Sequence, residues 1–238
     1  MDEIYRIVAK MHRDGGAAGQ RSFDSVGRKF AEADFILERL NNTRGTLVEA
    51  GFFFSAFLSA ARSVTLVLQA VMKDVDGFKD WYEVHQRELK ADPVARYFKN
   101  RRDMAVHPGE FAIFGIVPAS ASDKEGSRYL MWPSMENNSS SNEILEAGPT
   151  ARIYMKSLAK LIITCYETFG SEIDPEIHYT KENLERLGLT IEDVEESLGY
   201  QRGWTLVDGS DDEIERRLQL LRRTMPNPQF RPILMKYL

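Results

Sequence analysis

The chain has 238 residues, and its 31 Lys and Arg against 36 Asp and Glu give a formal net charge of -5. This balance excludes a protein that coats nucleic acid through bulk positive charge, and the 43% hydrophobic content excludes a chain that is disordered throughout. Residues 1–110 hold 17 basic and 16 acidic residues (net +1), whereas residues 111–238 hold 14 and 20 (net -6). A site for a polyanion is therefore expected in the first half.

The single cysteine, Cys165, excludes an internal disulfide and a Cys-based zinc cluster. Asp2 and Glu3 stand where a signal peptide needs positive charge, so we expect a cytoplasmic protein. The four histidines show no metal-ligand spacing, and the chain has no phosphate loop or dinucleotide-binding motif. We therefore expect neither a metal nor a cofactor.

The first predicted helix covers residues 24–40, because apolar residues recur there with steps of four and three. A second helix is predicted to start at Thr46, which forms a capping-box pattern with Glu49. It continues through residues 51–72, which have the length of a membrane span. Arg62 stands at the centre of this segment, and a central Arg costs about 2.5–3.5 kcal/mol on insertion scales. We therefore predict a central helix wrapped by other helices, with no membrane span.

A short helix is predicted at residues 78–89, and Asp92-Pro93 then gives the cap and first residue of another. This next helix should end near Val106, because Pro108 disfavours the α conformation at His107. Two aromatic and β-branched runs follow, separated by a charged loop, and they predict a β-hairpin at about residues 110–134.

The second half begins with a predicted long helix at residues 149–169, which Gly170 would end. Its expected buried face comprises Ile153, Leu158, Leu161, Ile162, Cys165 and Phe169. Three short helices follow, at residues 181–187, 191–198 and 211–224. The predicted fold is mainly α, a four- or five-helix bundle at residues 24–170 with the inserted hairpin. An N-terminal segment (1–23) precedes it and an acidic helical extension (171–238) follows it.

One cluster of residues suggests a chemical function. Arg96, Lys99, Arg101 and Arg102 lie within seven residues, and His107 comes just past the expected helix end. Arginine holds phosphate as a planar, permanently charged fork, and an imidazole can move a proton near neutral pH. Together these groups could cleave RNA without a metal, with Arg stabilising charge at phosphorus.

The segment Arg102-Asp103-Met104-Ala105-Val106-His107 resembles the R-x4-6-H signature of the HEPN superfamily, which contains helical bundles of many RNA-cleaving toxins and defence proteins. Asp103 stands where that signature commonly has Asn, Asp or His, and Phe98 stands where it has an aromatic residue. The long apolar helix before the motif is also similar. The resemblance covers about residues 24–170.

The resemblance implies a HEPN-like fold and a metal-independent endoribonuclease that acts on RNA as a homodimer, with a composite site where two bundles meet. Arg102 would contact the scissile phosphate, His107 would transfer the proton, and Asp103 would orient either of them. Arg101, Lys99 and Arg96 would bind the rest of the substrate.

Three alternatives stay open at this point. On a helical wheel Arg101 points along the apolar face, so it is either the true phosphate ligand or a buried structural residue, whereas the motif register favours Arg102. The bundle could also be a non-catalytic module that binds a nucleotide or a protein. Lastly, it could be a structural homodimer whose acidic tail recruits a protein partner.

Overall fold

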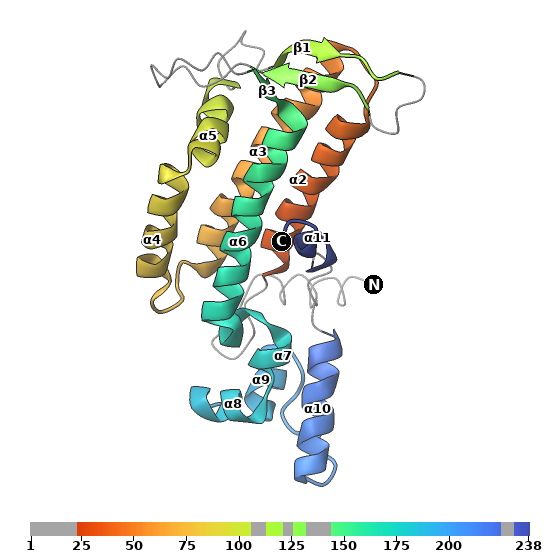
Figure 1. Cartoon of the computed structure of the whole chain (residues 1–238). Coiled ribbons are helices and arrows are strands. Elements are labelled where there is room, and N and C mark those ends of the chain that lie inside the picture. Colours follow the sequence, from red (N-terminus) through yellow and green to blue (C-terminus); the bar gives the residue numbers. More distant parts are fainter. Residues whose placement is uncertain (1–22, 106–112, 121–125, 132–143, 225–230) are drawn as a thin grey trace. The chain divides into compact units, whose positions relative to one another are not determined.

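The computed structural model describes residues 23–105, 113–120, 126–131, 144–224 and 231–238. The chain is mainly helical, with a small antiparallel sheet inserted between helices and a helical C-terminal region, which confirms the expected fold class (Figure 1). The helices of the first half are α2 (Asp24–Asn42), α3 (Leu47–Met72), α4 (Phe78–Ala91) and α5 (Pro93–Ala105). The strands are β1 (Ile113–Val117), β2 (Arg128–Met131) and β3 (Leu145–Glu146). The later helices are α6 (Ala147–Ile173), α7 (Pro175–His178), α8 (Lys181–Leu187), α9 (Ile191–Ser197), α10 (Asp211–Thr224) and α11 (Arg231–Met235).

The chain forms two compact units. One holds residues 26–162 together with residues 231–238, and the other holds residues 23–25 and 163–224. We call them the bundle unit and the C-terminal unit. α11 follows the C-terminal unit in sequence, yet it belongs to the bundle unit. Lys236 and Tyr237 hold it there, because both side chains donate to Asp34 of α2, at 2.8 and 2.6 Å.

The apolar stripe that predicts α2 is buried as expected. Its residues Val26, Phe30, Ala33, Leu37 and Leu40 are at most 1% exposed. The start of α3 also follows the sequence pattern, because Thr46 caps it and its Oγ1 accepts the Glu49 N–H at 3.3 Å. Both helices therefore form where the periodicity and the cap residues favour them.

α3 supplies much of the core of the bundle unit. Phe54, Phe57, Val64 and Leu68 are at most 1% exposed. By length and composition alone this helix could cross a membrane, and 44% of its most apolar 18-residue window is buried inside the protein. Near its centre, Arg62 donates to the Oγ1 of Thr65 at 2.9 Å.

The start of α5 is fixed by Asp92. One carboxylate oxygen accepts the Val94 N–H at 2.8 Å and the other accepts the Ser157 hydroxyl of α6 at 2.9 Å. A proline at the first helical position loses no hydrogen bond, so Pro93 suits this site. These contacts confirm the expected cap and join α5 to α6.

The predicted hairpin is present, with β1 antiparallel to β2 and Val117 opposite Arg128. β3 adds a third strand that the sequence pattern did not predict, because two residues are too few to show an alternation. The strand pair is anchored to the end of α2, where the Gly126 N–H donates to the Asn41 carbonyl at 3.1 Å. A Cβ on Gly126 would lie 2.4 Å from the Thr43 carbonyl oxygen, so this approach requires glycine.

α6 departs from its prediction in two ways. It continues past Gly170 to Ile173, with a non-helical backbone at Phe169, so this glycine does not end the helix. Ile153 was expected to be buried but is 50% exposed, because the buried side of the helix passes instead through Ala151, Tyr154 and Met155. The remaining predicted core residues of α6 are buried.

The C-terminal unit has its own apolar core. That core consists of Tyr179, Leu184, Ile191, Val194, Leu218 and Leu221. The short helices α8, α9 and α10 match their predicted ranges within one residue. Beside the core, the buried Arg217 pairs with Glu192 and Glu195 and lies 3.6 Å from Glu213. A cation surrounded by carboxylates in this way ties α9 to α10.

Candidate functional site

The predicted basic cluster lies on the last three turns of α5. Tyr97 and Phe98 anchor this part of the helix, because they are 5% and 1% exposed. The Phe98 ring packs against Phe54 and Phe57 of α3, at centroid distances of 6.0 and 5.7 Å. The C-terminal end of α5 is therefore held on a rigid aromatic core, level with the first turns of α3.

Arg101 is the basic residue of the cluster that turns toward this core. Its Cζ lies 5.3 Å from the centroid of the Tyr97 ring, a distance suited to a cation–π contact. Burial raises the pKa of the Tyr97 hydroxyl, and the charge of Arg101 opposes that shift. This position agrees with the helical wheel and favours the structural reading of Arg101.

Arg102 lies at the edge of the same face, with a side chain that is 40% exposed. Asp103 lies next to it, with 3.5 Å between Arg102 Nη1 and Asp103 Oδ1, and Lys99 Nζ donates to the other carboxylate oxygen at 3.1 Å. The hydrogen bond from Lys99 holds the pKa of Asp103 below its ordinary value, so this carboxylate is ionised at neutral pH. The three side chains form an exposed charged group with a net charge of +1.

Two further residues of the predicted site are Arg96 and His107. Arg96 is exposed one turn earlier. His107 falls in residues 106–112, outside the described residues, and so does its expected contact with Asp103. The structure therefore brings together Lys99, Arg102 and Asp103. Within the described ranges, no group of three or more His, Cys, Asp or Glu side chains could hold a metal ion.

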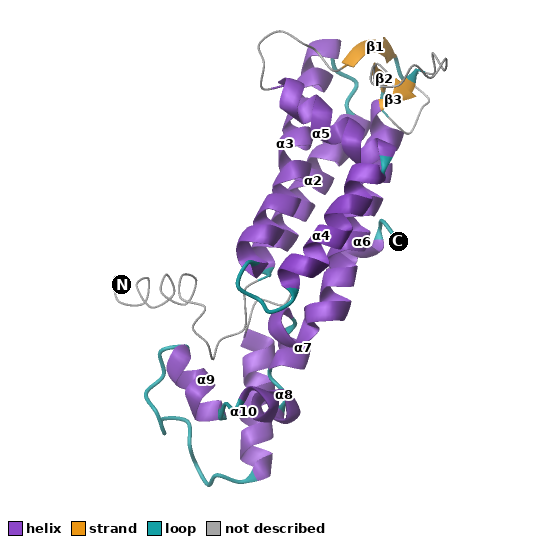
Figure 2. Cartoon of the chain, turned by 90° about the vertical axis from the view of Figure 1, so that its left-hand side faces the viewer, coloured by secondary structure: helices purple, strands orange, loops and turns teal. Residues whose placement is uncertain are grey.

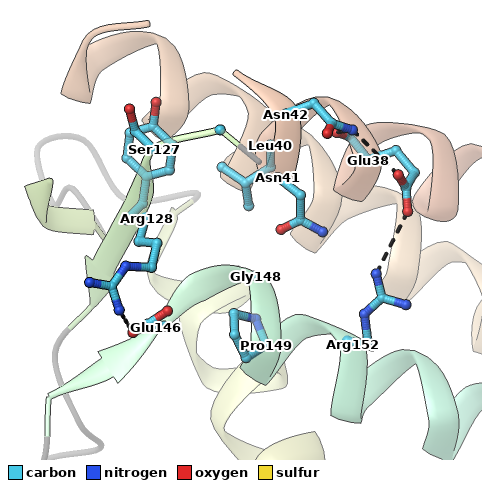
Figure 3. Close-up of a pocket in the computed structure, with 12 residues that line it drawn as sticks. Glu38, Leu40, Asn41, Asn42, Ser127, Arg128, Glu146, Gly148, Pro149 and Arg152 are labelled. Atoms are coloured by element: carbon cyan, nitrogen blue, oxygen red, sulfur yellow. Dashed lines mark hydrogen bonds and ion pairs between the residues drawn. The ribbon is translucent and has the colours of Figure 1, made fainter. Parts of the chain in front are cut away.

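A cavity of about 360 Å³ lies in the bundle unit. It is formed by three segments that are far apart in the chain, namely the end of α2, the turn into β2, and the start of α6 (Figure 3). Two arginines, two glutamates and two asparagines are among its lining residues: Arg128, Arg152, Glu38, Glu146, Asn41 and Asn42. No sequence motif joins these residues, so only the fold reveals the cavity.

Comparison with known proteins gives one match. The family model described as "Bacteriophage lambda protein ea47" matches residues 52–173, slightly more than half of the chain. The matched region runs from α3 to the end of α6 and includes all of α5 and the sheet. The search of curated proteins and the search of solved structures give no match. The resemblance to HEPN proteins remains a prediction.

Proposed function

The chain belongs to the bacteriophage lambda protein ea47 family, and we propose that this member binds RNA at the end of α5 and cleaves it without a metal ion. The observation that carries the proposal is the exposed group of Lys99, Arg102 and Asp103 on a helix that the aromatic core holds in place. A helix that is held in place and carries exposed cationic side chains suits a phosphate ligand. Such side chains lower the activation barrier of cleavage only when their positions are fixed before the substrate binds.

The proposed reaction is the transphosphorylation that the HEPN resemblance implies. The ribose 2′-oxygen attacks the adjacent phosphorus and the bond from phosphorus to the 5′-oxygen breaks, which leaves a 2′,3′-cyclic phosphate and a 5′-hydroxyl. Arg102 would stabilise the negative charge of the phosphorane. One His107 would accept the 2′-hydroxyl proton and a second would protonate the leaving oxygen. Asp103 would orient Arg102, beside which it lies.

Two His107 side chains at one site require two copies of the chain, so the proposal includes a homodimer. One face of α3 supports it. The half-buried Arg62 lies on this face between Ser59 and Leu66, and the exposed residues around it are apolar or small. They are Val48, Phe52, Ser55, Ser59 and Leu66. Figure 2 shows α3 along one side of the bundle unit. An exposed helix face on which most residues are apolar or small is typical of a protein–protein contact.

The composite site also sets the direction of that contact. Phe98 packs against Phe54 and Phe57, so Arg102 lies near the N-terminal end of α3. If two α3 helices pack in parallel, both Arg102 side chains lie at the same end of the dimer. An antiparallel pair would place them at opposite ends of the contact, where they could not form one site.

The experiment is cleavage of a single-stranded RNA by the full chain in excess EDTA. We expect products that end in a 2′,3′-cyclic phosphate, loss of cleavage in His107→Ala, and unchanged cleavage in Arg87→Gln, which removes an exposed charge from α4. Cleavage by His107→Ala at the wild-type rate would refute the mechanism. RNA binding that depends on Arg102 without any cleavage would instead identify a non-catalytic RNA-binding module.

A further inference from the structure

The cavity at the end of the bundle unit has the size of a small-molecule site. Its volume of about 360 Å³ lies within the range of roughly 300–1,000 Å³ that is usual for ligand pockets. Its walls are fixed by backbone contacts, since the Gly126 and Ser127 N–H groups donate to the carbonyls of Asn41 and Thr43 at 3.1 and 2.9 Å. A preformed polar cavity of this kind needs little rearrangement to bind a ligand.

Among the described residues, the Arg152 guanidinium has no carboxylate at hydrogen-bond distance, and its Cζ lies 5.9 Å from the centroid of the Tyr237 ring. Its nearest carboxylate is Glu38, with 3.8 Å between the nitrogen and the oxygen, which is too long for a hydrogen bond. Glu38 is already paired with Lys236, whose Nζ lies 2.7 Å from the same carboxylate oxygen. Within the described part of the chain, the Arg152 guanidinium therefore has cationic N–H donors that no carboxylate takes up.

Arg128 supplies a second guanidinium on the other side of the cavity. Its Nη1 donates to Glu146 Oε1 at 2.8 Å, and the remaining N–H groups of the fork are not used by that bond. Figure 3 shows the two guanidinium groups on opposite sides of Gly148 and Pro149. A ligand in the cavity would therefore meet a hydrogen-bond donor with positive charge at each end.

The space between the arginines is lined by amide side chains. Asn41 lies directly over Gly148, because a Cβ on that glycine would be 2.2 Å from Asn41 Oδ1. Asn42 lies beside it, where its Nδ2 donates to the Glu38 carbonyl at 2.8 Å. Amides can both donate and accept, as recognition of a sugar or a nucleobase requires. Gly148 therefore lets the Asn41 side chain lie against the first turn of α6.

We propose that this cavity binds a small phosphate monoester of the nucleoside monophosphate class. The phosphate lies against the Arg152 guanidinium, which can offer two parallel N–H donors to two phosphate oxygens. The nucleoside extends past Asn41 and Asn42 toward Arg128. The inference is independent of the proposed RNA cleavage, because it uses none of the residues at the end of α5.

The test is isothermal titration calorimetry of the full chain at low salt with four probes: AMP, CMP, adenosine and inorganic phosphate. We expect at least one nucleotide to bind, Arg152→Gln to weaken it by about tenfold or more, and Arg152→Lys to recover only part of that loss. The exposed control Arg87→Gln should bind as the wild type does. Adenosine, which lacks the phosphate, should bind at least about tenfold more weakly than AMP.

The arms of the experiment separate the possible ligands. In one outcome, inorganic phosphate binds as tightly as the nucleotides to the wild type and fails to bind to Arg152→Gln. That result would support a phosphate subsite at Arg152 and identify free phosphate as its ligand. Three results would overturn the proposal: no binding of any probe, adenosine as tight as AMP, or equal affinity in Arg152→Gln. Circular dichroism and a thermal melt test whether Arg152→Gln is folded. We expect it to be folded, because the Arg152 side chain is half-exposed in the wild type.

Discussion

The guanidinium of Arg101 lies over the ring of Tyr97, with 5.3 Å between Cζ and the ring centroid. Its neighbour Arg102 lies beside the exposed carboxylate of Asp103. The sequence motif allows either arginine to bind phosphate. Because one contacts a buried aromatic ring and the other lies near solvent, their substitution should have different effects.

The first prediction compares these two arginines. Arg102→Gln should lower kcat for RNA cleavage by about 10²–10³, the usual loss when one group that stabilises transition-state charge is removed. Arg101→Gln should lower it less than about tenfold and should reduce the free energy of unfolding by about 0.5–1 kcal/mol through loss of the cation–π contact. Single-turnover cleavage and urea unfolding of both variants measure these effects. If Arg101→Gln lowers kcat more than Arg102→Gln does, then Arg101 contacts the phosphate and Arg102 does not.

The second prediction concerns the direction of the α3 contact in the dimer. In a parallel pair, Phe52 meets Phe52 of the second copy, so the single variant Phe52→Cys should form an intermolecular disulfide under mild oxidation. Phe52 and Leu66 are each seven residues from Ser59, so an antiparallel pair centred there would place Phe52 opposite Leu66. Non-reducing gel electrophoresis distinguishes the two arrangements.

The control for this experiment is the wild-type chain. Its only cysteine, Cys165, is buried, and burial raises the pKa of its thiol to about 12, so it should remain unreactive. Cross-linking of Phe52→Cys/Leu66→Cys, together with none in Phe52→Cys, would establish the antiparallel pair. That result would rule out a composite site built across α3, whether or not RNA is cleaved.

Most helices of both units could be predicted from the sequence because each of them carries a local signal, whereas the sequence pattern does not predict the short helices α7 and α11. The stripe of α2, the Thr46 cap of α3 and the Asp92-Pro93 start of α5 are all contained in a few consecutive residues. Ile153 shows the limit of this approach. An apolar residue on a helix is buried only if another element covers that side, and the sequence of α6 does not say which side is covered.

The two candidate sites also differ in whether the sequence alone predicts them. The cluster on α5 could be found from the sequence, because Lys99, Arg102 and Asp103 are neighbours on one helix. The cavity could not, because Arg128 and Arg152 come together only after the hairpin docks on the end of α2. The sequence also does not predict that Gly126 and Gly148 lie close to the end of α2, because this contact forms only in the folded chain.

The third prediction tests the aromatic anchor of α5. Phe98 is 1% exposed and stacks on Tyr154 with 5.0 Å between ring centroids. Phe98→Ala should therefore lower the free energy of unfolding by about 3–5 kcal/mol, through lost burial and the cavity left behind. The matched control is Phe35→Ala, whose side chain is 58% exposed and should cost about 1 kcal/mol or less. Urea unfolding followed by circular dichroism measures both, and equal costs would contradict the core position of Phe98.

The fourth prediction concerns the pH dependence of the C-terminal unit. The Glu213 carboxylate accepts the N–H groups of Val207, Asp208 and Gly209, at 2.7, 2.6 and 2.5 Å. These bonds, led by that of Val207, hold the pKa of Glu213 below its ordinary value of 4.5. A carboxylate with a lowered pKa stabilises the fold above its unfolded pKa, and this contribution is lost as the pH falls through the folded value. The loop before α10 should therefore stay closed at pH 6 and open as the pH falls below the ordinary pKa of a glutamate.

Amide hydrogen exchange can follow this opening at residues 207–209 in the full chain. In the wild type, protection of these amides should fall steeply as the pH drops below that ordinary pKa, after correction for the intrinsic exchange rate. Glu213→Gln keeps a carbonyl acceptor but cannot ionise, so its protection should be lower at pH 6 and should change little over the same range. The bonds in question are charge-assisted only when the acceptor is a carboxylate. A variant that retained the steep wild-type profile would show that another group, such as Glu192 beside Arg217, controls the transition.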